Sequence, residues 1–339
     1  MYHSLFEILK RKGYEEIIQV YSHYANQSIR LLDNSPYIEF DWIVGRLEPN
    51  VEFVTEYRSK DLVNEGIFYT DSSGRSLMKR KRDQRDGYKF AQSEASAGNY
   101  YPLVTGILLK DEKKDLQMSI VTDRAEGGGS IQDGQIEIMI HRRVATDDGL
   151  GVSETLNEIG VDNRGLVVRG RHLLALTNME EGIKFFREHA LKSVWKPVIA
   201  FRHDSKNEPL DYKSWSLLNT KLPSQVNVLT VEPISQENNV LTILFRVEHF
   251  YEPNEHSTLS KSITLDMNKI FNKHQLLDAK EVTLGANMYK TESFQRLKWS
   301  INATSEDKKG RHEMPNFNGK TIELHPMQIR SFIIKLEKR

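Results

Sequence analysis

The sequence predicts a mostly β protein, built chiefly from antiparallel strands in two packed units. Apolar and polar residues alternate with a period of two from about Ile17 onward, as they do in half-buried strands. Stretches of this kind recur between turn residues, at intervals typical of a β-sandwich. At 339 residues, the chain is long enough to bury one large core or two medium ones.

The first 16 residues predict a short helix ahead of the strands. Leu5, Phe6, Ile8 and Leu9 precede a Lys-Arg-Lys run, which is the pattern of an amphipathic helix. The segment lacks the long apolar core of a secretory signal peptide. We therefore treat residues 1–16 as a leader to the first β unit.

The strands of the first unit follow in order, with one helix at its end. The alternating segments are residues 37–44, 66–75, 115–124, 135–144 and 165–176. The glycines of residues 125–134 predict a loop, because glycine supplies the positive φ angles that turns require. Residues 178–193 predict a helix, since they open with an Asn cap and an acidic first turn.

Strands resume after a polar stretch around residues 204–214. They are expected at residues 227–234, 240–250, 262–267, 281–289, 296–301 and 321–336. The segment Leu-Pro-Ser-Gln-Val at residues 222–226 is the expected boundary. The two predicted units are therefore residues 17–222 and 223–339.

Composition narrows the class of protein. Forty-seven basic residues balance 47 acidic ones, so no overall field attracts nucleic acid or an anionic membrane. The basic run from Lys79 to Arg85 is interpreted as a solvated loop or strand edge. The chain has no cysteine, which excludes disulfides and thiolate zinc sites. It also has no apolar run of the roughly 18 residues that a membrane span needs.

Asp147 and Asp148 are the first candidates for catalysis, because glycosidases use pairs of carboxylates. Neighbouring residues on a strand point to opposite faces, whereas two catalytic carboxylates must face each other about 5 to 9 Å apart. The Asp-Asp-Gly sequence is also an ordinary turn. We therefore favour a turn over a catalytic pair.

A metal site is not indicated either. The eleven histidines are scattered, and none belongs to a fixed-spacing motif such as HExxH. His141, His172, His249 and His325 adjoin apolar strand residues, where a hydrogen-bonded structural role is the expectation. The Gly-Gly-Gly-Ser run at residues 127–130 lacks the lysine of a phosphate loop, which favours a flexible turn.

Arg142 and Arg143 are the stronger candidates for a functional role. They close a predicted strand just before a glycine-rich loop, where guanidinium donors could reach sugar hydroxyls at the rim of a cleft. Structural ion pairs, with Asp147 or Asp148 as partners, are the alternative. Composition alone favours the ion pairs.

Two sequons, at Asn26 and Asn302, permit N-glycosylation if the chain enters the secretory pathway.

Several blocks of the sequence, in the same order, resemble one enzyme family. The longest block is "VTDRAEGGGSIQDGQIEIMIHRRVATDDGLGVSETLNE", and the others are "SPYIEFDWIVG", "GIFYTDSSGR" with "KRKRD", "AGNYYPL", "VRGRHLLAL", "LFRVEHFY", "RLKWS" and "IELHPMQIRSF". They resemble the C-terminal part of family 38 glycoside hydrolases, specifically the lysosomal acid α-mannosidases. The resemblance runs from about Gln19 to Leu336.

The resemblance implies a fold and a division of functions. It implies a galactose-mutarotase-like β-supersandwich over residues 17–222 and a smaller β-sandwich over residues 223–339. Family members are retaining, zinc-dependent exo-α-mannosidases whose zinc ligands, nucleophile and acid/base residue lie in an N-terminal catalytic domain. The chain would therefore be a non-catalytic portion that binds no metal itself, and Arg142 or Arg143 would reach the sugar cleft.

The implied partners are the N-terminal catalytic domain and, through the complete enzyme, a mannose-containing oligosaccharide. The implied process is mannose and N-glycan catabolism, with the complete enzyme lysosomal or secreted. A stand-alone carbohydrate-binding or structural β-sandwich protein, without hydrolase activity, is the alternative.

Overall fold

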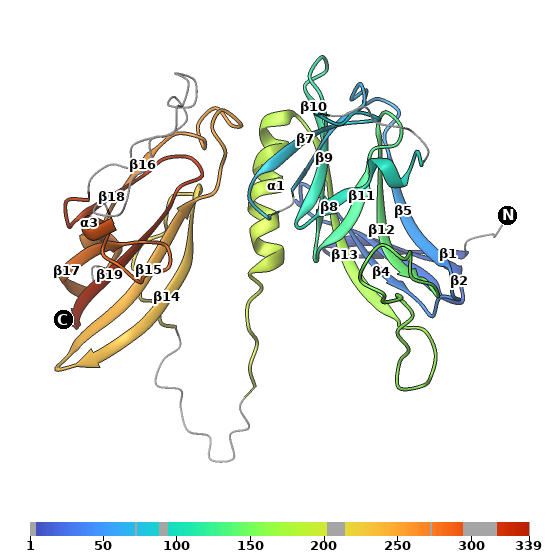
Figure 1. Ribbon diagram of the computed structural model, residues 1–339. Coiled ribbons are helices and arrows are strands. Elements are labelled where there is room, and N and C mark those ends of the chain that lie inside the picture. The colour runs from blue at the N-terminus through green and yellow to red at the C-terminus, as the bar shows by residue number, and fades with distance from the viewer. Residues whose placement is uncertain are drawn as a thin grey trace. The chain divides into compact units, whose positions relative to one another are not determined.

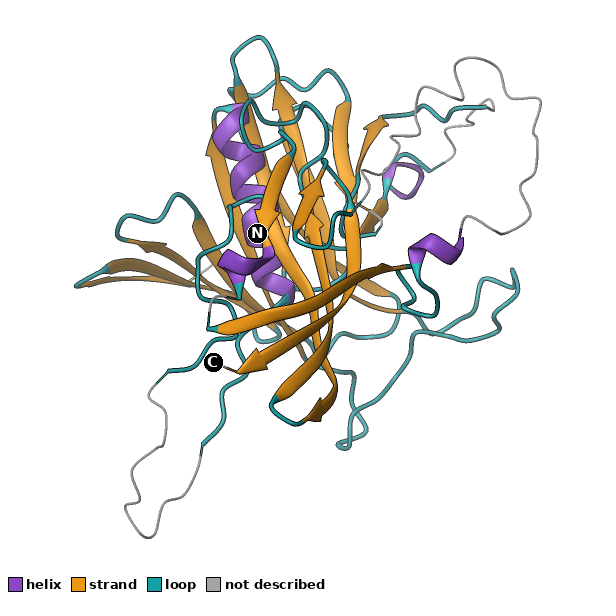
Figure 2. Ribbon diagram, turned by 90° about the vertical axis from the view of Figure 1, so that its left-hand side faces the viewer, coloured by secondary structure: helices purple, strands orange, loops and turns teal. Residues whose placement is uncertain are grey.

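A computed structural model describes residues 5–71, 73–87, 94–201, 214–271, 273–293 and 317–338. Contacts within the chain divide it into two compact units, Met1–Ile199 and Ala200–Arg339. Strands dominate the described residues (Figure 2), which confirms the predicted mostly β class. The helices that the structure describes include none long and apolar enough to cross a membrane.

The first unit is a sandwich of two antiparallel sheets (Figure 1). Among the described residues, nine strands form the larger sheet. In spatial order they are β1 (Leu5–Arg11), β2 (Tyr14–Ser22), β3 (Ala25–Leu32), β4 (Ile38–Val44), β13 (Val168–Thr177), β10 (Leu116–Thr122), β9 (Gly106–Asp111), β6 (Ile67–Asp71) and β7 (Leu77–Lys81). The smaller sheet is β5 (Val51–Arg58), β12 (Gln135–Arg143), β11 (Glu126–Gly129) and β8 (Tyr101–Leu103). A 3-10 turn, η1 (Ala97–Asn99), precedes β8.

The core of the first unit lies between the two sheets. Alternate residues of the strands point inward, so Ile107 and Ile120 of the larger sheet meet Ile136 and Ile138 of the smaller one. These side chains are fully buried. The alternation at residues 115–124 and 135–144 therefore marked Ile120, Ile136 and Ile138 correctly, whereas β9, which carries Ile107, was not among the expected strands.

Helix α1 (Met179–Val194) covers part of the larger sheet on its other face. The Asn178 side chain accepts a hydrogen bond from the Glu181 amide at 2.9 Å and caps the helix, as predicted. Ile183, Phe185 and Phe186 pack with residues of β9, β10 and β13 in a second apolar cluster. The expected helix at residues 178–193 is thus confirmed.

The leader is a strand, and the predicted helix within residues 1–16 is wrong. Residues of β1 pair antiparallel with β2, from Leu5 opposite Val20 to Arg11 opposite Tyr14. Gly13 has φ +97° at the tight turn between the two strands, a conformation that favours glycine. This ladder, which spacing along the leader cannot reveal, overrides the helical pattern of its apolar residues.

The three glycines at residues 127–129 lie in strand β11, so the predicted loop there is also wrong. A Cβ on Gly128 would lie 2.6 Å from the carbonyl oxygen of Glu137, and one on Gly129 would lie 2.2 Å from that of Asn99. Because glycine has no side chain, Gly128 and Gly129 let neighbouring backbone segments approach β11 closely. Within residues 125–134, the positive φ angle belongs to Gly134.

The second unit has a four-stranded sheet in the order β14 (Val226–Glu237), β15 (Val240–His249), β19 (Ile329–Lys338) and β17 (His274–Val282). A two-stranded sheet pairs β16 (Ile263–Asp266) with β18 (Thr321–Leu324), and two short helices, α2 (Met267–Ile270) and α3 (Lys290–Ser293), complete the described part. The strand expected at residues 281–289 instead begins at His274 and ends at Val282. The expected strand at residues 296–301 lies outside the described residues.

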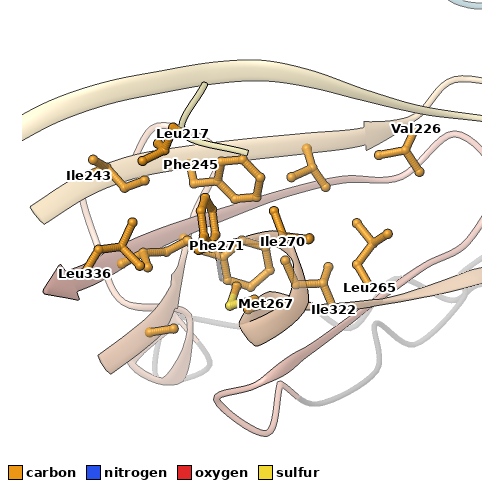
Figure 3. Close-up of a cluster of buried hydrophobic side chains, with 14 of the residues drawn as sticks. Leu217, Val226, Ile243, Phe245, Leu265, Met267, Ile270, Phe271, Ile322 and Leu336 are labelled. Carbon is orange, nitrogen blue, oxygen red and sulfur yellow. The ribbon is translucent and has the colours of Figure 1, made fainter. Parts of the chain in front are cut away.

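Figure 3 shows the apolar core of the second unit, in which Phe245 and Phe271 meet edge to face with ring centroids 5.3 Å apart. Leu217 belongs to this core, and Leu222 packs against it. The division between the units therefore falls earlier than the boundary predicted at residue 222, because residues before that point already bury their side chains in the second unit.

Candidate functional site

The candidate site is the end of β12 and the long segment that follows it. β12 and β5 run antiparallel side by side (Figure 1), with Arg142 opposite Glu52 and Arg143 opposite Val51. A register shift between Met139 and His141 bends the ladder just before the arginines. Residues 144–167 follow as an irregular segment between β12 and β13. Isolated backbone bridges join Val144 to Leu156 and Ile159 to Gly165 within it.

The two arginines differ in how firmly they are held. The Nη2 atom of Arg142 lies 3.4 Å from a carboxylate oxygen of Glu52, and both side chains are about half exposed. Arg143 donates from Nε to the side-chain oxygen of Asn157 at 2.7 Å and from Nη1 to the carbonyl oxygen of Leu47 at 2.9 Å. Arg143 therefore ties the loop to the sandwich, whereas Arg142 presents a solvent-accessible guanidinium at the strand end.

Asp147 and Asp148 form turns in the segment after β12. Asp147 accepts from the Gly149 amide at 3.0 Å, and Asp148 accepts from the Leu150 amide at 2.9 Å. Such bonds from a side chain to the backbone two residues later are Asx-turns. The ion pairs expected between these carboxylates and the arginines are replaced by Arg142 with Glu52 and by the two hydrogen bonds of Arg143.

The segment after β12 also carries exposed apolar side chains, which were not among the site residues expected from the sequence. Leu150, Val152 and Val161 are each at least 79% exposed, and Leu156 and Ile159 are about half exposed. Single exposed apolar residues are ordinary, but a run of them on one segment marks an interaction surface. The signal was available in the sequence as apolar residues spaced through an otherwise polar loop.

The four histidines singled out in the sequence make structural hydrogen bonds, as expected. His141 bonds the Leu166 carbonyl oxygen at 3.2 Å, and His325 bonds the Ser262 hydroxyl at 2.6 Å. Fully buried His172 joins the Tyr57 hydroxyl at 2.8 Å to a carboxylate oxygen of Glu126 at 2.9 Å.

His249 is buried and held as a neutral ring. Its Nε2 lies 3.0 Å from the Lys261 carbonyl oxygen, and its Nδ1 accepts from the Tyr251 amide at 3.3 Å. Burial lowers the pKa of His249 below its ordinary value, because the charged imidazolium would lose its hydration. An Nδ1 that already faces an amide hydrogen also has no room for a proton of its own.

The part of the chain that the structure describes does not offer a donor set for a metal ion. No group of three or more His, Asp or Glu side chains converges among those residues. Zinc sites need three or four such ligands in a small volume. A zinc ion therefore does not fit the residues that the structure describes.

The basic run at Lys79 to Arg85 borders the larger sheet, as predicted. It begins in the edge strand β7. Arg80 lies over the Tyr101 ring at 4.2 Å, and Arg82 pairs with Asp133 at 2.7 Å. Of the two sequons, Asn26 is exposed on β3, and Asn302 lies outside the described residues.

Comparison with known families explains the arrangement. Residues 3–150 match the glycosyl hydrolases family 38 C-terminal domain. Over these residues the chain belongs to this family. The match begins within the leader, so residues 3–16 are part of the family 38 domain and not an unrelated addition.

Curated relatives extend the family 38 likeness over almost the whole chain. The chain is 34% identical to lysosomal alpha-mannosidase from Cavia porcellus and 33% identical to that from Homo sapiens, in each case over 97% of its length. It is 31% identical to a probable alpha-mannosidase from Arabidopsis thaliana, over 99% of its length. The chain spans about a third of the length of these relatives, at 32–33% of each.

A solved alpha-mannosidase structure has a similar fold. An alpha-mannosidase from Enterococcus faecalis V583 aligns with 97% of this chain and 35% of its own, with a TM-score of 0.57 and 12% identity. At that identity the likeness concerns the fold alone. It agrees with the expected supersandwich followed by a smaller sandwich.

Proposed function

We propose that the chain is the C-terminal, non-catalytic portion of a retaining, zinc-dependent α-mannosidase, and that it completes the sugar cleft of that enzyme. The observation that carries the proposal is the end of β12. There, one arginine anchors the loop and the other leaves its guanidinium accessible. In this proposal Arg142 binds a sugar hydroxyl, and Arg143 holds the strand end in position.

The chemistry itself would come from elsewhere in the complete enzyme. Retaining hydrolysis needs a nucleophile and an acid/base carboxylate that face each other across the glycosidic bond. Asp147 and Asp148 are held in turns of their own backbone. We assign the two catalytic carboxylates and the zinc ligands to an N-terminal catalytic domain, as the family resemblance implies.

The exposed apolar side chains after β12 support an interaction with that domain. Burying Leu150, Val152 and Val161 against a partner would remove their apolar surface from water, which stabilises association by about 25 cal/mol for each Å² buried. The loop that carries them is tied to the sandwich through Arg143 and Asn157. A preformed loop loses little conformational entropy when a partner binds.

The process that fits this assignment is the removal of α-linked mannose from oligosaccharides during N-glycan catabolism. Two relatives are named lysosomal, so we infer that the complete enzyme works in the lysosome. Secretion is the alternative that the family resemblance implies.

The proposal is tested by hydrolysis of an aryl α-mannoside at acidic pH with added zinc. The first sample is this chain alone, and the second is a chimera in which the chain replaces the matching third of the Cavia porcellus enzyme. We expect no hydrolysis by the chain alone and activity from the chimera. Arg142→Ala in the chimera is expected to lower kcat/KM about 10- to 100-fold, since a hydrogen bond from a charged donor contributes about 1.5–3 kcal/mol.

Arg58→Ala is the matched control. Arg58 is also about half exposed and lies 3.0 Å from one carboxylate, that of Glu56, at the opposite end of the ladder between β5 and β12. We expect its kcat/KM to stay within twofold of the unchanged chimera. Hydrolysis by the isolated chain would refute the assignment of chemistry to another domain. Equal effects of Arg142→Ala and Arg58→Ala would refute the role of Arg142.

A further inference from the structure

The far half of the segment between β12 and β13 folds into a small turn of its own, residues 159–165. Within it, the Gly160 amide donates to the Arg164 carbonyl oxygen at 2.7 Å, and the Asn163 amide donates to the Gly160 carbonyl oxygen at 3.0 Å. Asn163 has φ +57°, a left-handed conformation that asparagine tolerates. The backbone of the 159–165 turn is therefore closed by its own hydrogen bonds.

An ion pair ties the tip of the 159–165 turn to the sandwich. The Nη2 atom of Arg46, in the connection between β4 and β5, lies 2.7 Å from a carboxylate oxygen of Asp162. The other carboxylate oxygen of Asp162 accepts from the Arg164 amide at 3.3 Å. One side chain thus closes the turn and also joins it to a residue more than 100 positions earlier in the chain.

The base of the 159–165 turn packs against the same connection between β4 and β5. Gly165 is buried, and a Cβ there would lie 2.9 Å from the Leu47 carbonyl oxygen and 3.2 Å from Nη1 of Arg143. That carbonyl oxygen is also the one to which Arg143 donates. The turn is therefore held at both ends, through its backbone at Gly165 and through the carboxylate of Asp162.

An apolar side chain stands at the tip of this rigid turn. Val161 is fully exposed, and Ile159, Leu166 and Val167 around it are 41–52% exposed. A run of apolar side chains on a fixed surface marks a contact with a partner. Valine is branched at Cβ, which leaves it few χ1 rotamers to lose when a partner covers it.

The partner of this turn is the part of a complete α-mannosidase that lies outside this chain, so the inference rests on the proposed function. The chain covers 32–33% of its curated relatives, and about two thirds of each relative therefore lies beyond it. The base of the turn packs beside Arg143, at the edge of the proposed cleft. If another domain completes that cleft, the surface beside the cleft faces that domain.

We propose that Val161 contacts the catalytic domain of the complete enzyme, and that Arg46 and Asp162 are positioning residues for this contact. An exposed ion pair adds little to the stability of the isolated chain. Here it holds the turn in the conformation that the partner covers, which removes an ordering cost from association. The pair therefore acts on assembly of the two domains, and Arg142 keeps its separate role at the sugar.

The contact is tested by hydrogen exchange, read by mass spectrometry on peptides that cover residues 159–165. The two samples are the intact 339-residue chain and the chimera described above. We expect these amides to exchange at least tenfold more slowly in the chimera than in the isolated chain. Val161→Asp should return exchange in the chimera to within twofold of the isolated chain, because the contact would strip water from a carboxylate. Val198→Asp is the matched control, since Val198 is 94% exposed elsewhere, and it should leave the slowed exchange unchanged.

The positioning role is tested with Asp162→Asn, which keeps an oxygen for the Arg164 amide and removes the charge that pairs with Arg46. We expect exchange in the 159–165 turn to rise at least threefold, in the isolated chain and in the chimera. The charge swap of Arg46→Asp with Asp162→Arg should restore it to within twofold of the unchanged protein. Glu65→Gln breaks another exposed ion pair of the first unit and should have no effect on the turn.

Hydrolysis of the aryl α-mannoside by the same chimera lets the two proposals fail separately. An active chimera without slowed exchange in the turn would overturn the contact and leave the proposed function standing. Slowed exchange in an inactive chimera would support the contact and refute the proposed function, and the loss of both would overturn both. A charge swap that does not restore exchange would overturn the positioning role. Exchange in the isolated chain that slows as its concentration rises would assign the turn to a second copy of the chain instead.

Discussion

The buried ion pair between Arg330 and Glu281 allows the loss of folding stability in a Glu281 variant to be predicted in kcal/mol. Arg330 of β19 is 1% exposed and donates to the Glu281 carboxylate of β17 from Nε at 2.9 Å and from Nη2 at 2.7 Å. Lys290 approaches the same carboxylate at 3.0 Å. Glu281→Gln keeps the shape of the side chain and removes its charge, so the Arg330 guanidinium stays buried but loses the carboxylate charge at residue 281.

The expected cost follows from this burial. Removing one partner of a buried pair destabilises a protein by about 3–5 kcal/mol, because the remaining charge cannot regain its hydration. Lys290 is partly exposed and can turn to water, but Arg330 cannot. Exposed pairs contribute about 0–1 kcal/mol, so Glu15→Gln, which breaks the exposed pair with Lys10, is the matched control.

Hydrogen exchange resolved to single peptides separates the two units. Glu281→Gln is expected to speed amide exchange in β15 and β19 about 100- to 4,000-fold, since each 1.4 kcal/mol is a factor of ten, while exchange in β9 and β10 stays unchanged. The double change to Met at Glu281 and Arg330 should recover part of the loss, because it leaves no buried charge at either of these two positions. If Glu281→Gln accelerated exchange no more than Glu15→Gln does, this account of the second unit would be wrong.

Three further predictions concern packing, capping and pH. Gly128→Ala should lower the free energy of unfolding by about 1–3 kcal/mol in urea titrations, because its Cβ would lie 2.6 Å from a carbonyl oxygen. A Cβ on Gly127 would meet its nearest atom at 3.7 Å, so the control Gly127→Ala should change the free energy of unfolding by less than about 1 kcal/mol. Equal effects of the two variants would contradict the packing argument. Asn178→Ala should cost about 0.5–2 kcal/mol through loss of the α1 cap, and Asn178→Asp should restore most of it, as measured by the urea midpoint. The pKa of His249 is lowered in the folded chain, whereas in the unfolded chain it has the ordinary value of about 6.5. The unfolded state therefore binds more protons as the pH drops below about 6.5, and the free energy of unfolding should fall over that range. His249→Gln should flatten the urea midpoint between pH 7.5 and 5.5, and an unchanged slope would exclude His249 as a source of that dependence.

Strand β12 and helix α1 were predictable because their determinants are local, whereas β5 was not among the expected strands. The alternation over residues 135–144 predicted β12, and the Asn cap with its acidic turn predicted α1. Both signals lie within one element, and each reports which side faces the core. The two arginines at the end of β12 were found in the same way.

The partners of those arginines could not be predicted, because they lie far away along the chain. Sequence proximity pointed to Asp147 and Asp148, whereas Arg142 pairs with Glu52 and Arg143 reaches Leu47. These contacts exist only because β5 lies beside β12, and strand pairing across some 80 residues leaves no mark in spacing. The leader strand escaped prediction for a different reason: its partner is the next strand, but its apolar residues fit a helix as well as a hairpin.

The different bonds of the two arginines separate positioning from recognition. Arg143 donates one hydrogen bond to the Leu47 carbonyl oxygen and one to the Asn157 side chain of the loop. Its loss would therefore release the segment that carries Leu150 and Val152. Arg142 is held by one carboxylate at 3.4 Å, a distance that a sugar hydroxyl could compete with. If both act as we propose, Arg143→Ala should weaken assembly with a catalytic domain, whereas Arg142→Ala should leave assembly intact and impair turnover. A strand end that does both tasks with adjacent residues needs no carboxylate of its own, which is consistent with Asp147 and Asp148 being held in turns.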